Sequence, residues 1–161
     1  MMINLNAHCP CGQNDSNIPV SYRKCCAPYH QANKTPVTPE QLMRSRYSAF
    51  VIKQYDYLIH TYHPAFLHTL TAETLAKTDD LQWLSLQIMS NHIQEHSGEV
   101  CFQAWYRDVN GINAIHECSQ FICEDGLWFY TQGEQKPAVY PKRNETCLCH
   151  SGKKYKQCCL K

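Results

Sequence analysis

The chain has 161 residues, of which 11 are cysteine, 18% are charged and 43% are hydrophobic, and its formal net charge is +1. This composition excludes a disordered chain, and the length allows one ordinary domain with small appendages. No apolar run approaches the ~20 residues of a membrane helix, and residues 1–8 lack the basic start and apolar segment of a signal peptide. We therefore expect a cytoplasmic protein, in which an odd and dense set of cysteines indicates metal binding rather than disulfides.

Eight of the cysteines fall in two clusters at the ends of the chain, and the clusters repeat one another. Each reads C-x-C, a spacer, a tyrosine with a basic residue after it, and then C-C. The spacer between the inner cysteines has 13 residues in the first copy and 8 in the second, which places an insert in the first copy around Asp15 to Val20. The predicted ligand sets are Cys9, Cys11, Cys25 and Cys26, and Cys147, Cys149, Cys158 and Cys159.

Four thiolates are a usual ligand set of structural zinc, which binds them in a tetrahedron. Segments this short cannot fold by burying apolar surface, so we expect metal binding to supply the free energy that folds each end. We predict two zinc ions per chain, with iron as an alternative metal. Two competing interpretations stay open: a redox switch of vicinal thiols, and replacement of a cysteine ligand by a flanking histidine, His30 or His150.

Charge divides the chain in the same way as the cysteines. Residues 1–35 carry a net charge of +2, residues 36–138 carry −6 and residues 139–161 carry +5. We therefore expect an N-terminal metal module (1–35), a middle domain (36–138) and a C-terminal metal module (139–161). The basic C-terminal module weakly favours an acidic or phosphate-bearing partner. The alternative is that its lysines only keep a short metal-bound tail soluble.

The middle domain is predicted to contain three helices and then an antiparallel sheet. A helix begins after Thr38, which has the capping signal of a helix start. Two shorter helices are expected over 56–62, ending before Pro64, and over 72–77.

From Trp83 the hydrophobic period changes to two, which is typical of half-buried strands. Leu84, Leu86 and Ile88 are predicted to share one face of the first strand. A second strand follows over 100–107, and turns at 108–111 and 124–126 divide two more strands, about 112–123 and 127–132. Helices followed by strands predict an α+β domain.

A weak pocket signal lies on the third of these strands. Glu117, Ser119 and Phe121 share one face, so a buried Phe121 draws Glu117 toward the core. Glu117, Ser119, Trp128 and Tyr130 are candidate pocket residues for acid–base chemistry or ligand binding.

The favoured interpretation of Glu117 is nevertheless structural, as an ion pair with Arg44 or Arg46. One carboxylate without a second catalytic group is a weak catalytic signal, and the sequence has no phosphate loop, Ser-His-Asp set or Cys-His nucleophile pair. We therefore lean toward a protein that is not an enzyme. The other cysteines are expected to be reduced packing residues: Cys101, Cys118 and Cys123.

A more specific resemblance lies in the C-terminal cluster. It is similar to the SEC-C motif, the zinc-binding tail of the bacterial translocation motor SecA, through Cys147-x-Cys149-x-Ser151-Gly152-Lys153-Lys154-Tyr155-Lys156-x-Cys158-Cys159. In that family the motif contacts the chaperone SecB and the ribosome. The N-terminal cluster, with Pro28-Tyr29 and residues 41–50 after it, resembles the YchJ-type bacterial SEC-C proteins, although it lacks the Ser-Gly-Lys positions.

The resemblance implies a fold and a set of partners. The fold is α+β: a cone like that of nuclear transport factor 2 (NTF2-like), with three N-terminal helices packed on a curved antiparallel sheet, flanked by two small zinc-binding SEC-C modules. The partner is a SecB-like chaperone or the ribosome. We therefore predict a zinc-binding, non-enzymatic adapter. The alternatives are a small-molecule binding protein or enzyme that uses the pocket of the middle domain, and a nucleic-acid-binding protein that uses the basic modules.

Overall fold

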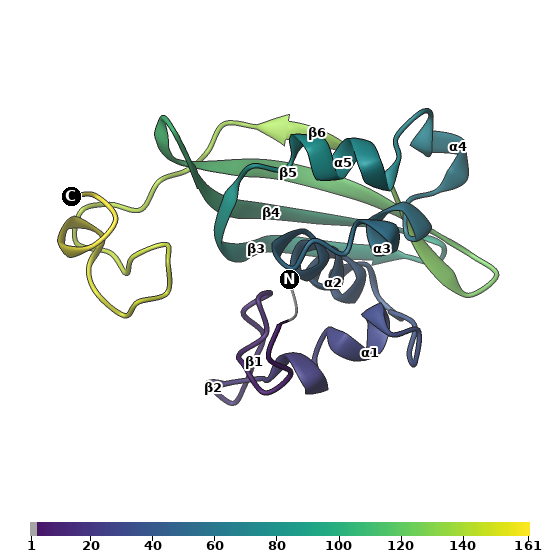
Figure 1. Ribbon diagram of the computed structural model, residues 1–161, viewed down its shortest axis with the longest axis horizontal. Helices are drawn as coiled ribbons and strands as arrows, with labels where there is room; N and C mark the ends of the chain where they lie inside the picture. The colour runs from purple at the N-terminus through teal and green to yellow at the C-terminus, as the bar shows by residue number, and fades with distance from the viewer. Residues whose placement is uncertain (1–2) are drawn as a thin grey trace.

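The computed structural model describes residues 3–161 (Figure 1). Its centre is a four-stranded antiparallel sheet in the order β3-β4-β5-β6. The strands are β3 (Gln82–Gln94), β4 (Ser97–Asp108), β5 (Gly111–Glu124) and β6 (Leu127–Lys136). The helices of the middle domain are α2 (Pro39–Val51), α3 (Tyr55–His60), α4 (Pro64–Leu67) and α5 (Ala72–Thr78). Figure 1 shows α2, α3 and α5 over one face of the sheet, so the predicted α+β class is confirmed.

The helix α2 begins where its capping signal predicts. Thr38 Oγ1 accepts a hydrogen bond from the backbone N–H of Gln41 at 3.2 Å, and Pro39 lies in the first turn. A cluster of buried side chains joins this helix to the inner face of the sheet and includes Leu42, Met43, Tyr47, Leu86, Val100, Phe102, Ala104 and Phe121. Burying these apolar side chains supplies the main driving force for folding of the domain.

The middle domain has one more helix than the three expected. Pro64 follows the end of α3 as predicted, but it also begins the single turn of α4. His63 makes this possible, because its Nδ1 accepts a hydrogen bond from the backbone N–H of Ala65 at 3.2 Å. Proline at the first position of a helix costs no hydrogen bond, so Pro64 marks a helix start as well as a helix end.

Both predicted hairpin turns are present. Asp108 pairs with Gly111, and Glu124 pairs with Leu127, so each turn has two central residues. In the second turn Asp125 and Gly126 have φ values of +50° and +79°. Asp-Gly is a favoured pair for this left-handed backbone.

The predicted face of Leu84 is wrong, because β3 has a β-bulge at this residue. Trp83 pairs with Tyr106 while Ser85 pairs with Trp105, so Leu84 is the extra residue of the bulge. Leu86 and Ile88 lie on the inner face as expected, but Leu84 packs on the opposite side, with Trp105. Strict alternation predicts the wrong face here because the bulge shifts the register by one residue.

The N-terminal segment lies against α2 (Figure 1). It contains β1 (Asn14–Asp15), β2 (Ile18–Pro19), a 3-10 helix (Tyr22–Lys24) and α1 (Ala27–His30). The β1–β2 hairpin turns through Ser16 and Asn17, both with positive φ, so it is formed by the insert that the sequence predicts in the first cysteine cluster. The insert therefore lengthens a turn without separating the cysteines.

The C-terminal segment forms a small unit at one end of the sheet and contains a 3-10 helix (Tyr155–Gln157) (Figure 1). A second buried cluster attaches this unit to the sheet, with Trp105 from β4 packed against Cys147, Leu148 and Tyr155. None of the helices within residues 3–161 is both long enough and apolar enough to cross a membrane.

Candidate metal centres

The N-terminal cysteines bring four sulfur atoms together. Cys11 Sγ lies 3.5 Å from Cys9 Sγ and 3.5 Å from Cys25 Sγ, and Cys25 Sγ lies 3.8 Å from Cys26 Sγ. All four sulfurs are within 4.8 Å of one another. Zinc–sulfur bonds of about 2.3 Å in a tetrahedron separate the sulfurs by about 3.8 Å. The cluster therefore has the size of a site for one tetrahedral ion.

The C-terminal cysteines form a second cluster of the same size. Cys149 Sγ lies 3.6 Å from Cys147 Sγ and 3.5 Å from Cys158 Sγ, and Cys158 Sγ lies 4.0 Å from Cys159 Sγ. These four sulfurs are also within 4.8 Å of one another. The two predicted ligand sets are each brought together, and either cluster can hold a metal ion.

The same backbone path builds both clusters. After each C-x-C pair the chain turns through a residue of positive φ, Gly12 at +70° and His150 at +57°. The N–H of that residue donates to the carbonyl of the first cysteine, at 3.0 Å in the first copy and 3.2 Å in the second. A buried tyrosine then begins a 3-10 helix that leads into the C-C pair, Tyr22 in one copy and Tyr155 in the other. The repeat in the sequence is thus a repeat in three dimensions.

The N-terminal cluster is buried against α2. Ser48 Oγ lies 3.3 Å from Cys26 Sγ and 3.6 Å from Cys9 Sγ, and Arg44 Nη1 donates to the carbonyl of Cys11 at 3.1 Å. Cys9, Cys11 and Cys26 belong to the same buried cluster as the core of the middle domain. This first site is therefore continuous with the core of the domain.

Histidine takes no part in the N-terminal cluster. His30 Nδ1 is 2.7 Å from the hydroxyl of Tyr22, and His30 Nε2 is 2.8 Å from the carbonyl oxygen of Ser45. Since a carbonyl can only accept, Nε2 carries the proton and Nδ1 accepts from the tyrosine. Both ring nitrogens are used, so His30 serves as a link between α1 and α2. At the other end, the exposed His150 forms the turn after Cys149.

The thiols of the N-terminal cluster form hydrogen bonds with one another. Hydrogen bonds between the sulfurs lower the pKa of Cys9 and Cys11 and raise the pKa of Cys25 and Cys26. A bound cation replaces such shared protons, because the ligands of zinc are thiolates.

The C-terminal cluster is more exposed and lies beside Ser151. Burial raises the pKa of the Cys149 thiol, but hydrogen bonds from Ser151 and from the neighbouring thiols outweigh burial and hold the pKa at about 6. Ser151 Oγ also lies 3.4 Å from Cys158 Sγ. A second contact fixes the cluster to the sheet, because Ser85 Oγ donates to the carbonyl of Leu148.

The predicted pocket residues line two separate cavities. Glu117, Ser119 and Tyr130 line one cavity on the inner face of the sheet. Trp128 lines a separate hollow with Tyr29, and its Nε1 donates to the carbonyl of Val37 at 3.1 Å.

The expected ion pair of Glu117 with Arg44 or Arg46 is replaced by neutral donors. The Glu117 carboxylate accepts from Ser119 Oγ at 2.7 Å, from the Tyr130 hydroxyl at 3.0 Å and from Gln135 Nε2. Arg44 pairs with Glu40 at 2.8 Å instead. The side chain of Glu117 occupies the space above Gly133, where a Cβ would overlap its carboxylate.

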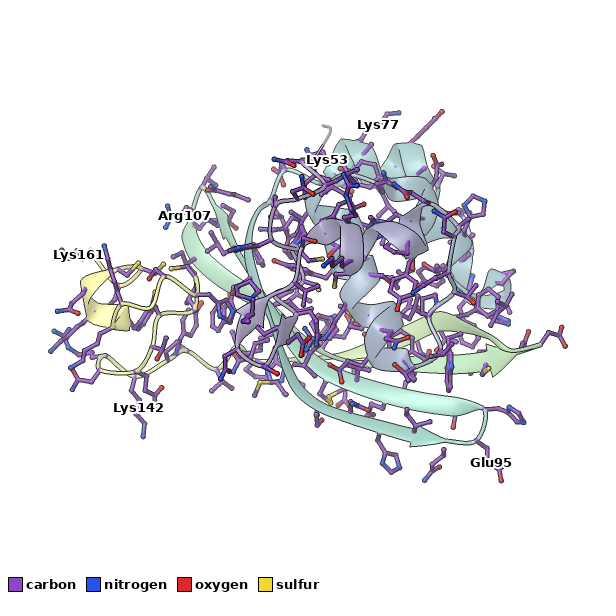
Figure 2. The ribbon with its side chains drawn as sticks, turned by 90° about the horizontal axis from the view of Figure 1, so that it is seen from below. Lys53, Lys77, Glu95, Arg107, Lys142 and Lys161 are labelled. Carbon is purple, nitrogen blue, oxygen red and sulfur yellow. A yellow bond between two sulfur atoms is a disulfide. The ribbon has the colours of Figure 1, made fainter. Side chains whose placement is uncertain are left out.

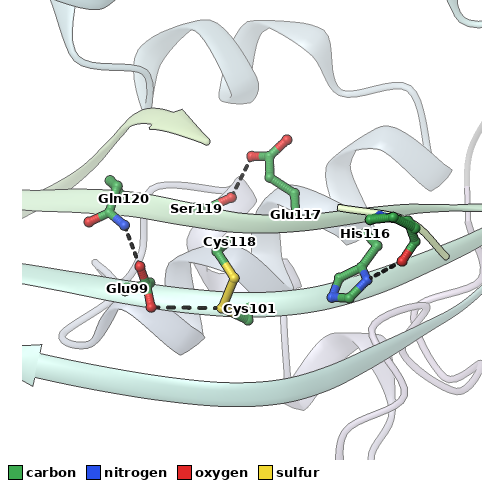
Figure 3. Close-up of a disulfide and its surroundings, with 8 residues drawn as sticks. Glu99, Cys101, His116, Glu117, Cys118, Ser119 and Gln120 are labelled. Carbon is green, nitrogen blue, oxygen red and sulfur yellow. Dashed lines mark hydrogen bonds between the residues drawn. A yellow bond between two sulfur atoms is a disulfide. The ribbon is translucent and has the colours of Figure 1, made fainter. Parts of the chain in front are cut away.

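One prediction about the remaining cysteines is wrong. Cys101 on β4 and Cys118 on β5 are direct partners across the ladder and form a disulfide, with their Cα atoms 3.9 Å apart (Figure 3). Figure 3 shows this bond beside β5 and Glu117 turned to the opposite side of the strand. Only the strand register reveals the pair, because its two cysteines lie 17 positions apart in the sequence and no local signal joins them. Cys123 is free, as expected.

The middle of the chain matches a known protein family. Residues 38–133 match the family described as YchJ, middle NTF2-like domain. This chain belongs to the YchJ family. A second match in the same chain, to the SEC-C motif, covers residues 143–161. The resemblance to YchJ-type SEC-C proteins with an NTF2-like middle domain is therefore confirmed.

Relatives of this YchJ-family chain align over almost its whole length. The UPF0225 protein Shewmr4_2054 of Shewanella sp. (strain MR-4) is 46% identical over 163 residues, which cover 96% of each chain. The UPF0225 protein VV1_2912 of Vibrio vulnificus (strain CMCP6) is 37% identical over 169 residues, which cover 95% of this chain and 98% of the relative.

Two solved structures share the fold. A SEC-C motif containing protein from Psychrobacter arcticus has a TM-score of 0.69 at 28% identity, over 95% of both chains. RPA3114, a SEC-C motif containing protein from Rhodopseudomonas palustris, has a TM-score of 0.71 at 28% identity, over 83% of this chain and 100% of that one.

Proposed function

We propose that this protein is a zinc-dependent, non-enzymatic adapter whose C-terminal module binds an acidic protein partner. The observation that supports the proposal is the C-terminal cluster itself, in which four sulfurs at tetrahedral spacing lie under a basic surface. Zinc at both clusters, two ions per chain, orders the modules.

The basic surface of the C-terminal module is exposed and unpaired. Its cationic side chains, which we call the basic set, are Lys142, Arg143, Lys153, Lys154, Lys156 and Lys161. The ion pairs found in residues 3–161 lie elsewhere, at Arg44 with Glu40 and at His63 with Glu124. Figure 2 shows Lys142 and Lys161 directed away from the rest of the molecule. Four thiolates and one zinc ion add −2 to the +5 of residues 139–161, so the loaded module remains cationic.

The middle domain and the N-terminal module act as the scaffold in this proposal. The N-terminal cluster is buried against α2, where a metal ion stabilises the core instead of presenting a surface. The resemblance to the SEC-C motif implies a SecB-like chaperone or the ribosome as the partner.

The proposal is tested with the zinc-loaded full-length chain and purified SecB or ribosomes. Substitution of Lys153, Lys154 and Lys156 by glutamine leaves all cysteines in place, and we expect it to weaken binding at least tenfold. The control neutralises two exposed lysines of the middle domain, Lys53 and Lys77, which Figure 2 shows far from the C-terminal module. We expect this control to bind like the parent chain.

The zinc content of each protein must be measured before its partner binding is compared. The variant and its parent must both carry two zinc ions per chain, so that a loss of binding reports the charge and not an unfolded module. Undiminished binding by the lysine variant, or by a chain ending at residue 141, would falsify the adapter proposal.

A further inference from the structure

The middle domain contains a cavity of about 300 Å³ between α2 and the inner face of the sheet. Its walls are mostly apolar, and they include Met43, Phe50, Leu58, Phe102, Ala104 and Ile115. This volume lies at the lower end of the range of small-molecule sites, which are typically apolar with a few convergent polar groups. Among its polar residues, Arg46, Trp83 and Glu117 bear most directly on what it can bind, while the carboxylate of Asp79, also in the lining, accepts from the Tyr55 hydroxyl at 2.9 Å.

The first of these groups is Arg46, a buried cation that forms no salt bridge within residues 3–161, although the charge of Glu117 acts on it across the cavity wall. The side chain is 6% exposed and lies in the cavity wall. Its Nη1 donates to the carbonyl of Leu58 at 2.8 Å and to Thr61 Oγ1 at 2.7 Å, while Nε and Nη2 donate to no protein atom in residues 3–161. Burial lowers the pKa of Arg46 to about 10, so the guanidinium stays charged at neutral pH.

The second group is the indole of Trp83, on β3. Its Nε1 is buried, and within residues 3–161 it has no hydrogen-bond partner. A buried donor left unpaired costs about 1–3 kcal/mol, so such groups are rare in a folded protein. Trp83 lines the same cavity as Arg46, but its Nε1 is enclosed by protein atoms, so the donors that a ligand there can reach belong to Arg46.

The third group, Glu117, already has its partners. Its carboxylate accepts from Ser119, Tyr130 and Gln135, so most of its accepting capacity is used. The ring of Tyr130 also lies under Arg46, with the guanidinium carbon 4.7 Å from the ring centroid. Tyr130 thus lies against both charges, and Arg46 keeps its free N–H groups for another acceptor.

We propose that this cavity binds a small organic monocarboxylate, with the carboxylate on Arg46 and an apolar body along the cavity wall. A planar guanidinium matches a carboxylate with two parallel N–H···O bonds. The charge of Glu117 in the same wall repels a second negative charge, which selects a monoanion over a phosphate dianion.

The probes are indole-3-acetate and its neutral counterpart indole-3-acetamide, titrated calorimetrically into the zinc-loaded full-length protein. The two molecules share the indole body and differ in the head group, because the amide is uncharged and has an NH2 donor in place of one carboxylate oxygen. We expect the acetate to bind at least tenfold more tightly than the amide. Equal affinity for the two, or binding of neither, overturns the proposal.

Two variants test the site at different points. Arg46→Gln removes the charge, and we expect it to abolish the preference for the acetate. Because Arg46 also holds the carbonyl of Leu58, Ala104→Leu provides an independent test: it fills the apolar wall and leaves every polar group in place. We expect at least a tenfold loss for both probes.

The matched control is Arg107→Gln, an exposed arginine on β4 outside the cavity. We expect it to bind both probes like the parent chain. Unchanged binding in a folded Ala104→Leu protein, or an equal loss in Arg107→Gln, places the probes outside the cavity and contradicts the proposal.

Discussion

Single polar side chains tie the first metal cluster to the middle domain. The hydroxyl of Ser48 contacts Cys9 and Cys26, and the ring of His30 connects the hydroxyl of Tyr22 to the backbone of Ser45. Groups around a metal that orient its ligands contribute substantially to metal affinity. The residues of this outer layer therefore have measurable roles, although none of them is a cysteine.

Ser48→Ala is expected to weaken metal binding at the N-terminal cluster about tenfold, because it removes the hydroxyl that two ligand sulfurs share. Competition with a chromophoric chelator measures the affinity of each site. Ser151→Ala is the matched control, since Ser151 contacts Cys158 of the other cluster and its loss should affect that site alone. A Ser48→Ala protein with two unchanged affinities would contradict this role.

His30 is expected to stay neutral below the pH at which an ordinary histidine becomes charged. Burial lowers its pKa from the usual value of 6.5. Because the folded state holds the proton more weakly than the unfolded state, the contribution of His30 to stability is complete above about pH 6.5 and falls as the pH decreases through the folded-state pKa. Nitrogen NMR of the ring should report a neutral Nε2–H tautomer at pH 6.5, whereas an imidazolium signal at that pH would contradict it.

At the scale of elements, the helix α2 contributes side chains to two sites. Arg44 and Ser48 face the N-terminal cysteines, while Met43, Arg46 and Tyr47 line the cavity. The sequence predicts the start of this helix because the cap at Thr38 is a local signal. It does not predict that the cysteine cluster packs on the helix, since that contact joins residues far apart in the chain. The bulge at Leu84 and the Cys101–Cys118 disulfide depend on strand register in the same way, and no pattern within one strand reveals them.

Loss of the metal at the two clusters should affect the middle domain differently. Cys26→Ser is expected to lower the free energy of unfolding of the middle domain by more than about 3 kcal/mol, because the cluster is part of its core. Cys158→Ser, the corresponding change in the C-terminal copy, should leave the unfolding of the middle domain within about 1 kcal/mol of the parent. Urea denaturation followed by far-ultraviolet circular dichroism measures both, and equal losses would refute the distinction.

The β4–β5 disulfide predicts a definite number of thiols. With one disulfide among 11 cysteines, nine thiols should react with Ellman's reagent in protein denatured with a chelator under non-reducing conditions. The remaining two should appear after reduction. In Cys118→Ala the lost pair frees Cys101, so ten thiols are expected with or without reductant. Eleven thiols in the unreduced parent would show that the bond is absent.

At the scale of the whole molecule, the two copies of one cysteine motif face different surroundings. The N-terminal copy lies within the core, while the C-terminal copy is attached to the end of the sheet through Trp105 and keeps its basic surface exposed. Trp105 is 1% exposed and packs edge to face on Tyr140, with ring centroids 5.2 Å apart. The fluorescence of Trp105 should therefore report whether the C-terminal module is packed on the sheet.

A chain ending at residue 141 is expected to expose Trp105 and to shift its fluorescence to longer wavelength, because Leu148 and Tyr155 no longer cover the indole. Subtracting the spectra of Trp105→Phe proteins, full-length and truncated, isolates this signal from Trp83 and Trp128. An unshifted difference spectrum would mean that the module does not pack on Trp105.

Two adjacent residues of β3 belong to different sites. Trp83 lines the cavity, and the next residue, Leu84, packs against the buried cluster that anchors the C-terminal module. A ligand in the cavity and a metal ion in the C-terminal cluster would therefore each restrain side chains on the same short stretch of β3.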